Sequence, residues 1–213
     1  MFTMRTLSEG KWVILVLLAL GGATWRWCPV RWAPLLPLAG LGFVFWFFRD
    51  PPRMISPDPH LIVAPADGTV VEVRPVTEPL FLRGEAQLVA IFLSVFDVHV
   101  QRAPVASQIR WVQYQPGQFL DARHPQAGAR NEARMIGLET PDGFRCVVRQ
   151  VAGLIARRIV GWAGEGATLA KGDRLGMIRF GSRVELYLPP GTAITVTVGE
   201  HVKGGETILA RRR

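Results

Sequence analysis

Two uncharged apolar runs near the amino terminus constrain the fold more than any other feature of the chain. The first, Trp12–Trp25, has 14 residues, and the second spans Ala33–Phe48. Each is shorter than the roughly 20 residues that a perpendicular membrane-spanning helix needs. The sequence RWCPVRW between them supplies tryptophan and arginine, which favour the headgroup level of a membrane. We therefore expect residues 1–50 to form a helical hairpin that anchors the chain in a membrane.

The distribution of charge supports a lipid partner. The chain of 213 residues has a formal net charge of +8, of which residues 1–54 contribute +4. A basic, tryptophan-rich, apolar segment suits an anionic phospholipid membrane. No base-stacking array or recognition motif supports nucleic acid as the partner. A cleaved signal peptide is the alternative for the first run, but no small-residue cleavage site leads into a hydrophilic segment, so a retained anchor is expected.

The residue composition and the hydrophobic pattern change after this hairpin. Five prolines between Pro51 and Pro65 exclude a helix and predict a Pro-rich linker over residues 51–64. Short β-rich runs such as QLVAIFLSV, FRCVVRQV and RVELYL follow, separated by glycine and proline. This pattern predicts a mainly β class, with an antiparallel β-sandwich or barrel-like domain over residues 65–213. The one candidate helix in it is Ala152–Arg158, and residues 116–134 are predicted to be a functional loop.

One hairpin pattern recurs within the β region. VGWAGEGATLAKGDRLGMI and ITVTVGEHVKGGETILA share the order of β run, glycine-containing turn and β run, and ADGTVVEV is a candidate third copy. This pattern resembles the hairpin unit of biotinyl/lipoyl carrier domains. Neither Lys171 nor Lys203 has the context of a cofactor-bearing lysine, so a membrane-tethered carrier-like module remains only an alternative function.

The two cysteines predict neither a metal site nor a redox motif. Cys28 and Cys146 form no CxxC pair, and no cluster of metal-ligating residues accompanies them. We expect two unrelated thiols, and no bound metal.

Three stretches place a reactive side chain among small or turn residues: Asp67 in APADGTV, His99 in FLSVFDVHVQRAP, and Ser182 in RFGSRVELYLP. Taken singly, each has an ordinary structural explanation. If the second stretch is a strand, Asp97, His99 and Gln101 share one face. Asp67, His99 and Ser182 could also form the triad of a membrane-anchored serine hydrolase. However, no GxSxG elbow surrounds the serine.

Taken jointly with FFRDPPR, YQPGQFLDA and ARNEAR, these stretches resemble, in order and spacing, the pyruvoyl-dependent phosphatidylserine decarboxylases in their short bacterial and archaeal form. The resemblance implies a proenzyme that cuts its own backbone between Gly181 and Ser182. The products, residues 1–181 and 182–213, would remain together as a heterodimer, and a higher oligomer stays open.

The resemblance also implies the cofactor and the reaction. Ser182 would become a covalent pyruvoyl group, whose carbonyl condenses with the substrate amine and accepts the electrons released as CO2 leaves. The reaction would convert phosphatidylserine to phosphatidylethanolamine at the cytoplasmic face of the cell membrane. Archaetidylserine, with the same headgroup, is the alternative substrate.

Roles for three further residues follow from the same resemblance. Asp67 matches an aspartate that acts with a histidine and the serine in self-cleavage. His99 matches the first of two histidines found in longer members, and Arg102 stands at the position of the second. We expect His99 to serve both self-cleavage and proton transfer, and Arg102 to bind the carboxylate or phosphate of the substrate. The base that activates Ser182 stays open. The remaining histidines, His60, His124 and His201, are expected at the surface.

Overall fold

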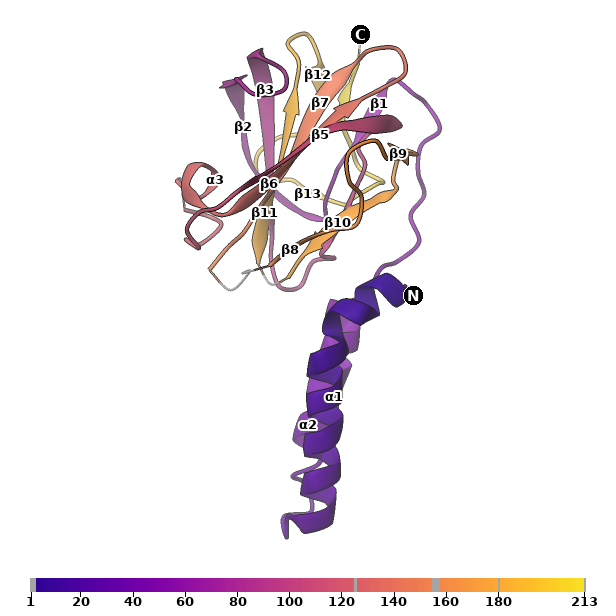
Figure 1. Cartoon of the computed structure of the whole chain (residues 1–213), viewed down its shortest axis with the longest axis vertical. Helices are drawn as coiled ribbons and strands as arrows, with labels where there is room; N and C mark the ends of the chain where they lie inside the picture. Colours follow the sequence, from indigo (N-terminus) through magenta and orange to yellow (C-terminus); the bar gives the residue numbers. More distant parts are fainter. Residues whose placement is uncertain (1–2, 125, 155–157, 180, 213) are drawn as a thin grey trace. The chain divides into compact units, whose positions relative to one another are not determined.

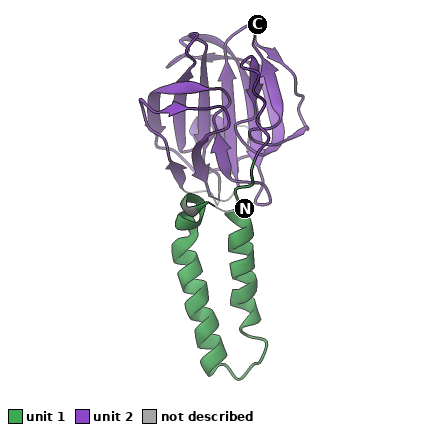
Figure 2. Ribbon diagram, turned by 90° about the vertical axis from the view of Figure 1, so that its right-hand side faces the viewer, with its two compact units in different colours: residues 1–52 green, residues 53–213 purple. Residues whose placement is uncertain are grey.

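The chain divides into two compact units, residues 1–52 and 53–213 (Figure 2). The computed structural model describes residues 3–124, 126–154, 158–179 and 181–212. Residues 53–64, which the sequence predicts to be a linker, lie within the second unit. The prolines thus keep this segment extended while it packs on the β domain, where Ile55 contacts Gly172 and Gly205.

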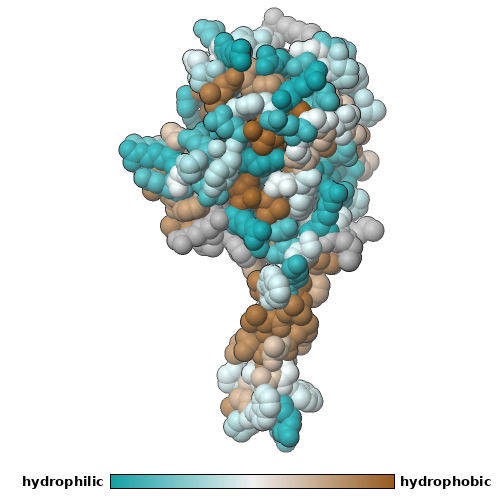
Figure 3. Space-filling model, viewed as in Figure 1, coloured by the Kyte–Doolittle hydropathy of each residue, from teal (hydrophilic) through white to brown (hydrophobic). Residues whose placement is uncertain are grey.

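The first unit is the predicted helical hairpin, formed by α1 (Met4–Trp27) and α2 (Leu35–Phe47). A capping box between Thr3 and Thr6 begins α1, and the helix therefore includes polar residues ahead of the apolar run. Glycines let the helices pack closely, since Gly40 lies against Leu17. Hydrophobic side chains cover much of the outer helical surface (Figure 3). By length and composition, α1 could cross a membrane.

Apart from the short helix α3, the regular elements in the described part of the second unit are all strands (Figure 1). Its elements are β1 (Leu61–Val63), β2 (Gly68–Glu78), β3 (Gly84–Leu93), β4 (Val100–Arg102), β5 (Ser107–Gln115), α3 (Ala127–Arg130), β6 (Ala133–Glu139), β7 (Arg145–Val151), β8 (Ile159–Gly161), β9 (Thr168–Leu169), β10 (Arg174–Ile178), β11 (Ser182–Leu188), β12 (Ala193–Ile194), β13 (His201–Val202) and β14 (Ile208–Arg211).

These strands form one large and two small sheets. The large sheet has the order β13-β2-β3-β11-β7-β6-β5-β9, and the small sheets have the orders β1-β14-β12 and β4-β10-β8. All strand pairs within the sheets are antiparallel. The mainly β, antiparallel class predicted from the sequence is confirmed. β11 lies in the middle of the large sheet, between β3 and β7.

Side chains alternate between two buried faces of the large sheet. In β3, Val89, Ile91 and Leu93 belong to the main core, whereas Leu88 and Ala90 belong to a second cluster on the opposite face. The main core also takes residues from both small sheets, and it therefore lies between them and the large sheet. Burial on both faces explains why the β3 sequence is continuously apolar instead of alternating.

The strand orders reveal an internal two-fold repeat. From its two ends to its centre, the large sheet runs β13-β2-β3-β11 and β9-β5-β6-β7, and the small sheets correspond strand by strand. β2 and β5 carry bulges at equivalent positions, between Val70 and Glu72 and between Ile109 and Trp111. One half, β4–β10, is thus inserted between β3 and β11 of the other half.

This repeat explains the hairpin pattern in the sequence. The two recurring stretches form β8–β10 and β12–β14, and the middle strands, β9 and β13, are the two end strands of the large sheet. ADGTVVEV is no third copy, because it leads into β2, whose counterpart is β5.

Two local predictions were wrong. Among the described residues of Ala152–Arg158 none is helical, and residues 155–157 lie outside the described part; the short helix in this unit is α3, inside the predicted loop. Asp97 and His99 do not lie in a strand with Gln101. β3 ends at Leu93 and β4 begins only at Val100, because a turn at residues 94–97 reverses the chain.

Candidate active site

Ser182 is the first residue of the central strand β11 and is completely buried. Its position in β11 places its side chain on the same face as Val184 and Leu186, toward the main core. The Ser182 hydroxyl makes no hydrogen bond to any described residue. A buried hydroxyl without a partner is costly in a folded protein and marks this position as a candidate for chemistry.

The peptide before Ser182 has an unusual conformation. Gly181 adopts a φ of +54°, in the left-handed region that glycine tolerates best. Its carbonyl oxygen lies directly against Gly153, where an added Cβ would come closer than 3.0 Å. Gly153 therefore leaves room for the carbonyl of the Gly181–Ser182 bond.

The ARNEAR motif fixes the segment that contains Gly153. Asn131 is fully buried, and its amide nitrogen donates to the Leu120 carbonyl at 2.9 Å and to the Ala152 carbonyl at 2.8 Å. Its side-chain oxygen accepts from the Leu120 N–H at 2.9 Å. One amide thus joins the loop over residues 116–132 to the residue before Gly153.

His99 is fully buried beside the turn that follows β3. Its Nδ1 lies 2.9 Å from the Asp97 carbonyl oxygen, which can only accept, so the neutral ring carries its proton on Nδ1 and its lone pair on Nε2. Asp97 closes the turn by accepting from the Ser94 N–H at 2.8 Å and the Ser94 hydroxyl at 2.7 Å. The turn therefore orients the imidazole through the backbone of Asp97.

Asp67 is held by an arginine from the Pro-rich segment. The Arg53 guanidinium contacts both carboxylate oxygens at 2.9 and 2.8 Å, and the Gly204 N–H donates to Asp67 Oδ1 at 2.8 Å. Burial raises the pKa of Asp67 above its ordinary value, although Arg53 and the Gly204 N–H favour the ionised form. The nearby carboxylate of Asp97 acts in the same direction as burial.

Asp67 and Ser182 flank the end of β3 from opposite sides. Thr69 of β2 pairs with Phe92, and Ser182 of β11 pairs with Leu93. Two neighbouring strand spacings separate β2 from β11, or about 10 Å between backbones. Since Ser182 Oγ has no partner among the described residues, the three predicted triad residues do not form a hydrogen-bonded triad.

Arg102 lies on β4 and is nearly buried. Its backbone N–H donates to the Pro65 carbonyl at 2.8 Å, and its guanidinium donates to the Gly172 carbonyl at 3.0 Å. The backbone of Arg102 therefore supports the segment before Asp67, and its side chain holds the turn at Gly172.

A pocket opens beside Gly181, with a volume of about 420 Å³. We call it the Gly181 pocket; its lining includes Phe92, Val95, Phe96, Arg123, Leu154 and Gly181. The lining comes from the turn after β3, the loop before β6 and the segment after β7, and it is mostly apolar. The pocket therefore gives access from the surface to the Gly181 side of the Gly181–Ser182 bond.

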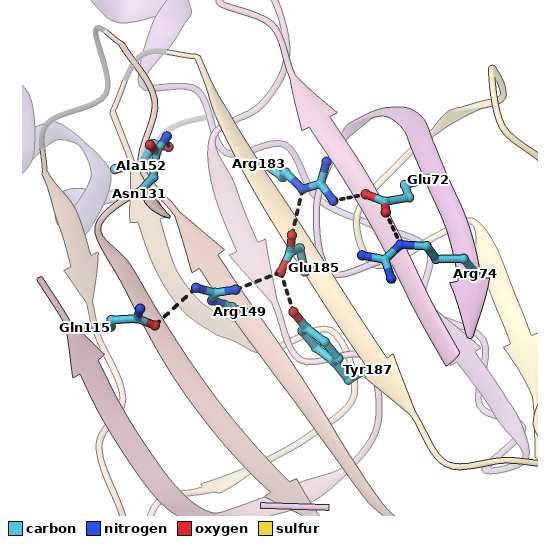
Figure 4. A network of polar contacts seen from close by, with 9 residues as sticks. All are labelled: Glu72, Arg74, Gln115, Asn131, Arg149, Ala152, Arg183, Glu185 and Tyr187. Carbon is cyan, nitrogen blue, oxygen red and sulfur yellow. Dashed lines mark hydrogen bonds and ion pairs between the residues drawn. The ribbon is translucent and has the colours of Figure 1, made fainter. Parts of the chain in front are cut away.

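A polar network occupies the opposite face of the large sheet (Figure 4). Glu185 of β11 accepts from the Arg183 side chain at 2.7 Å, from the Tyr187 hydroxyl at 2.6 Å and from Arg149 of β7 at 3.4 Å. Arg183 also pairs with Glu72 of β2. The network thus ties the residue after Ser182 to the strands on both sides of it.

Comparison with known proteins matches this chain to one family. The family model described as phosphatidylserine decarboxylase matches residues 41–210. A phosphatidylserine decarboxylase proenzyme of Symbiobacterium thermophilum is 50% identical over 183 residues, covering 85% of this chain and 85% of its own. Proenzymes of the same name from Gluconacetobacter diazotrophicus and Nitratidesulfovibrio vulgaris are 50% and 51% identical, covering 91% and 80% of this chain and 87% and 78% of their own. The chain belongs to the phosphatidylserine decarboxylase family.

Membership of the phosphatidylserine decarboxylase family confirms the resemblance found in the sequence and favours a carboxy-lyase over a hydrolase or a carrier module. The structure places Asp67 just before β2, His99 after the turn that follows β3, and Ser182 at the start of β11, and it places His60, His124 and His201 at the surface as expected. His201 Nε2 lies 3.6 Å from Asp97 Oδ1. Both cysteines are free thiols, and the described residues contain no metal-binding cluster.

Several residues of this phosphatidylserine decarboxylase fold had no role assigned from the sequence. Arg53 lies in the motif FFRDPPR, and Asn131 lies in ARNEAR. Both residues therefore belong to motifs that resemble the family, but the sequence assigned no function to either. Gly153 and Gln101 carried no signal. Gln101 bridges the His99 carbonyl and Gln150, at 2.8 Å each.

Proposed function

We propose that the protein is a pyruvoyl-dependent phosphatidylserine decarboxylase, made active by self-cleavage between Gly181 and Ser182. One observation carries the proposal: a buried Ser182 hydroxyl without a described hydrogen-bond partner follows a glycine in the left-handed conformation. Such an arrangement suits attack of the hydroxyl on the preceding carbonyl, and it serves no evident purpose in stabilising the sheet.

The proposed cleavage proceeds in balanced steps. Ser182 Oγ loses its proton and bonds to the Gly181 carbonyl carbon. The C–N bond breaks as the Ser182 nitrogen takes up a proton, so that an ester and a free amine replace the amide. Removal of the Ser182 Cα proton expels the Gly181 carboxylate and leaves a Cα=Cβ double bond. A proton then moves from the nitrogen to Cβ, which becomes a methyl group and leaves an imine at Cα. Water adds to this imine and ammonia leaves, so that Cα becomes the ketone carbon of the pyruvoyl group.

Residues of the site have distinct proposed roles in this chemistry. His99 exchanges protons through Nε2, since Nδ1 is directed to the Asp97 carbonyl. Asp67, fixed by Arg53, provides negative charge near the end of β3. Arg102 remains the proposed partner for the carboxylate or phosphate of the substrate. A pyruvoyl group at residue 182 would supply the electron-accepting carbonyl for loss of CO2.

The two products are expected to stay together as a heterodimer. β11 pairs along its length with β3 and with β7, and both partners belong to the larger product. Val184, Leu186 and Leu188 are also fully buried in the main core. Separation of the small product would expose these side chains and break the centre of the large sheet.

The test is the state of the purified chain. Wild-type protein should resolve on a denaturing gel into fragments matching residues 1–181 and 182–213, with the small fragment resistant to Edman degradation. Ser182→Ala should remain one chain and be inactive. A single intact band from active wild-type protein would exclude the pyruvoyl proposal and favour a hydrolase. Assays with phosphatidylserine and archaetidylserine, compared side by side, identify the preferred backbone.

We propose further that the helical hairpin anchors the enzyme at the cytoplasmic face of the cell membrane. Support comes from the long apolar helix α1 and from the exposed tryptophans of the first unit: Trp12, Trp25, Trp27, Trp32 and Trp46. Deletion of residues 1–50 should lower sedimentation with phospholipid vesicles more than it lowers self-cleavage. Equal loss of both would show that the hairpin is needed for folding of the β domain.

A further inference from the structure

The rim of the Gly181 pocket carries two large hydrophobic side chains that face solvent. Phe96, in the turn after β3, is 70% exposed, and Leu154, after β7, is 58% exposed. Phe96 is the most exposed aromatic side chain among the described residues of the second unit. The two come from segments far apart in the sequence and converge on one pocket, which points to a shared contact surface.

Cationic side chains accompany this rim. Arg123 also lines the pocket, lies 5.7 Å from the Phe92 ring centroid, and pairs with Asp121 at 2.8 Å. Arg158 is exposed, and its backbone lies near the segment before Gly181, because its carbonyl accepts from the N–H of Arg179. Apolar side chains combined with arginine suit the boundary between anionic headgroups and acyl chains.

Because Ser182 is buried, the substrate headgroup must enter the domain while the rest of the lipid stays outside. The reacting bond is inside the domain, whereas the acyl chains of a phospholipid substrate remain in the bilayer. A serine headgroup can enter the pocket beside Gly181 directly from the bilayer if the mouth of the pocket meets the membrane. A hydrophobic rim gains free energy at that boundary because it leaves water there.

We infer that Phe96 and Leu154 form a membrane-inserting rim, which docks the mouth of the Gly181 pocket on an anionic phospholipid surface. The inference rests on the proposed function for the identity of the substrate. It adds a second membrane contact, on the β domain itself, to the one proposed for the helical hairpin. The pocket volume, about 420 Å³, is within the ordinary range of sites for small polar groups.

The first test separates docking from chemistry. The double variant Phe96→Ser/Leu154→Ser, in the full-length chain, should self-cleave normally. Its apparent KM for vesicles of phosphatidylserine and phosphatidylcholine should rise roughly 10- to 100-fold, as expected for loss of two apolar contacts, whereas its KM for monomeric dihexanoyl phosphatidylserine should rise by clearly less. The matched control Leu80→Ser/Val198→Ser removes two exposed hydrophobic side chains elsewhere and should match wild type with both lipids.

The second test reads insertion directly. Phe96→Cys and Val198→Cys, each in a Cys28→Ser background, are labelled with an environment-sensitive NBD fluorophore; Cys146 is buried and should not label. Addition of the same vesicles should shift the emission at position 96 to the blue and leave position 198 unchanged. Identical responses at the two positions would overturn the inference.

The two tests keep the inference apart from the proposed function. Equal loss of turnover with monomeric lipid and with vesicles would show that the rim only shapes the pocket, and would refute docking. Absence of self-cleavage in the wild type would refute the proposed function, whatever the fluorophore at position 96 reports.

Discussion

Substitution of Gly153 by alanine should block self-cleavage without unfolding the domain. A methyl group at this position would lie within 3.0 Å of the Gly181 carbonyl oxygen. The Gly181 carbonyl oxygen must therefore move away by roughly 1 Å, to the ~3.3 Å at which carbon and oxygen normally touch. Because the carbonyl carbon is the atom that Ser182 Oγ must attack, this displacement falls directly on the reacting geometry. A misplacement of about 1 Å can slow a reaction by about 100-fold, and we expect Gly153→Ala to slow cleavage by that factor.

The assay follows the appearance of the small fragment by intact mass after a pulse of expression. Hydroxylamine, which cleaves esters, should release no additional fragment from Gly153→Ala, since the ester does not form. Gly164→Ala is the matched control, because a Cβ added at Gly164 would meet open space and the variant should cleave normally. Thermal unfolding of Gly153→Ala in the uncleavable Ser182→Ala background separates a local effect from a loss of fold.

Two results would refute this reasoning. Cleavage of Gly153→Ala at the wild-type rate would show that the carbonyl position is unimportant or that the segment relaxes freely. A large fall in the unfolding temperature in the Ser182→Ala background would show that the substitution acts on folding instead.

Three further predictions concern charge and burial. Glu185→Gln leaves two buried arginines with a neutral partner, and it should lower the free energy of unfolding by about 3 kcal/mol in urea titrations, whereas Glu139→Gln, at an exposed ion pair, should cost less than about 1 kcal/mol; similar values for the two would contradict the buried network. Burial raises the pKa of Cys146 to about 12, so a thiol reagent should modify only Cys28 in the native protein and both cysteines in denaturant. The pKa of Asp67 is raised, so the folded chain binds this proton more tightly than the unfolded chain, and protonation favours folding as the pH falls through the raised pKa. If self-cleavage uses the ionised carboxylate, its rate should decrease as the pH falls through the raised pKa of Asp67. A cleavage rate that is independent of pH in this range would remove Asp67 from the mechanism.

The sequence by itself determined the class of the fold and the order of the motifs. Periodic apolar runs and glycine-containing turns express local preferences, which are legible without knowledge of distant contacts. For the same reason the helical hairpin was predictable, although its first helix begins earlier than the apolar run because Thr3 and Thr6 cap it. The ordered set of motifs from FFRDPPR to RFGSRVELYLP, and no single motif, indicated the family.

Only the tertiary structure decided how the site is assembled, because its contacts join segments that no local pattern connects. Arg53 reaches Asp67 across 14 residues of chain, and the Gly204 N–H reaches it across 137. Asn131 fixes the segment of Gly153, and Gly153 makes room for the Gly181 carbonyl. The turn at residues 94–97 overrode the β-like pattern around His99, since Asp97 bonds to Ser94 more favourably than it could pair in a strand interior. The chemistry of this protein was visible as residue types along the chain, but their arrangement depends on the order of strands in one large sheet.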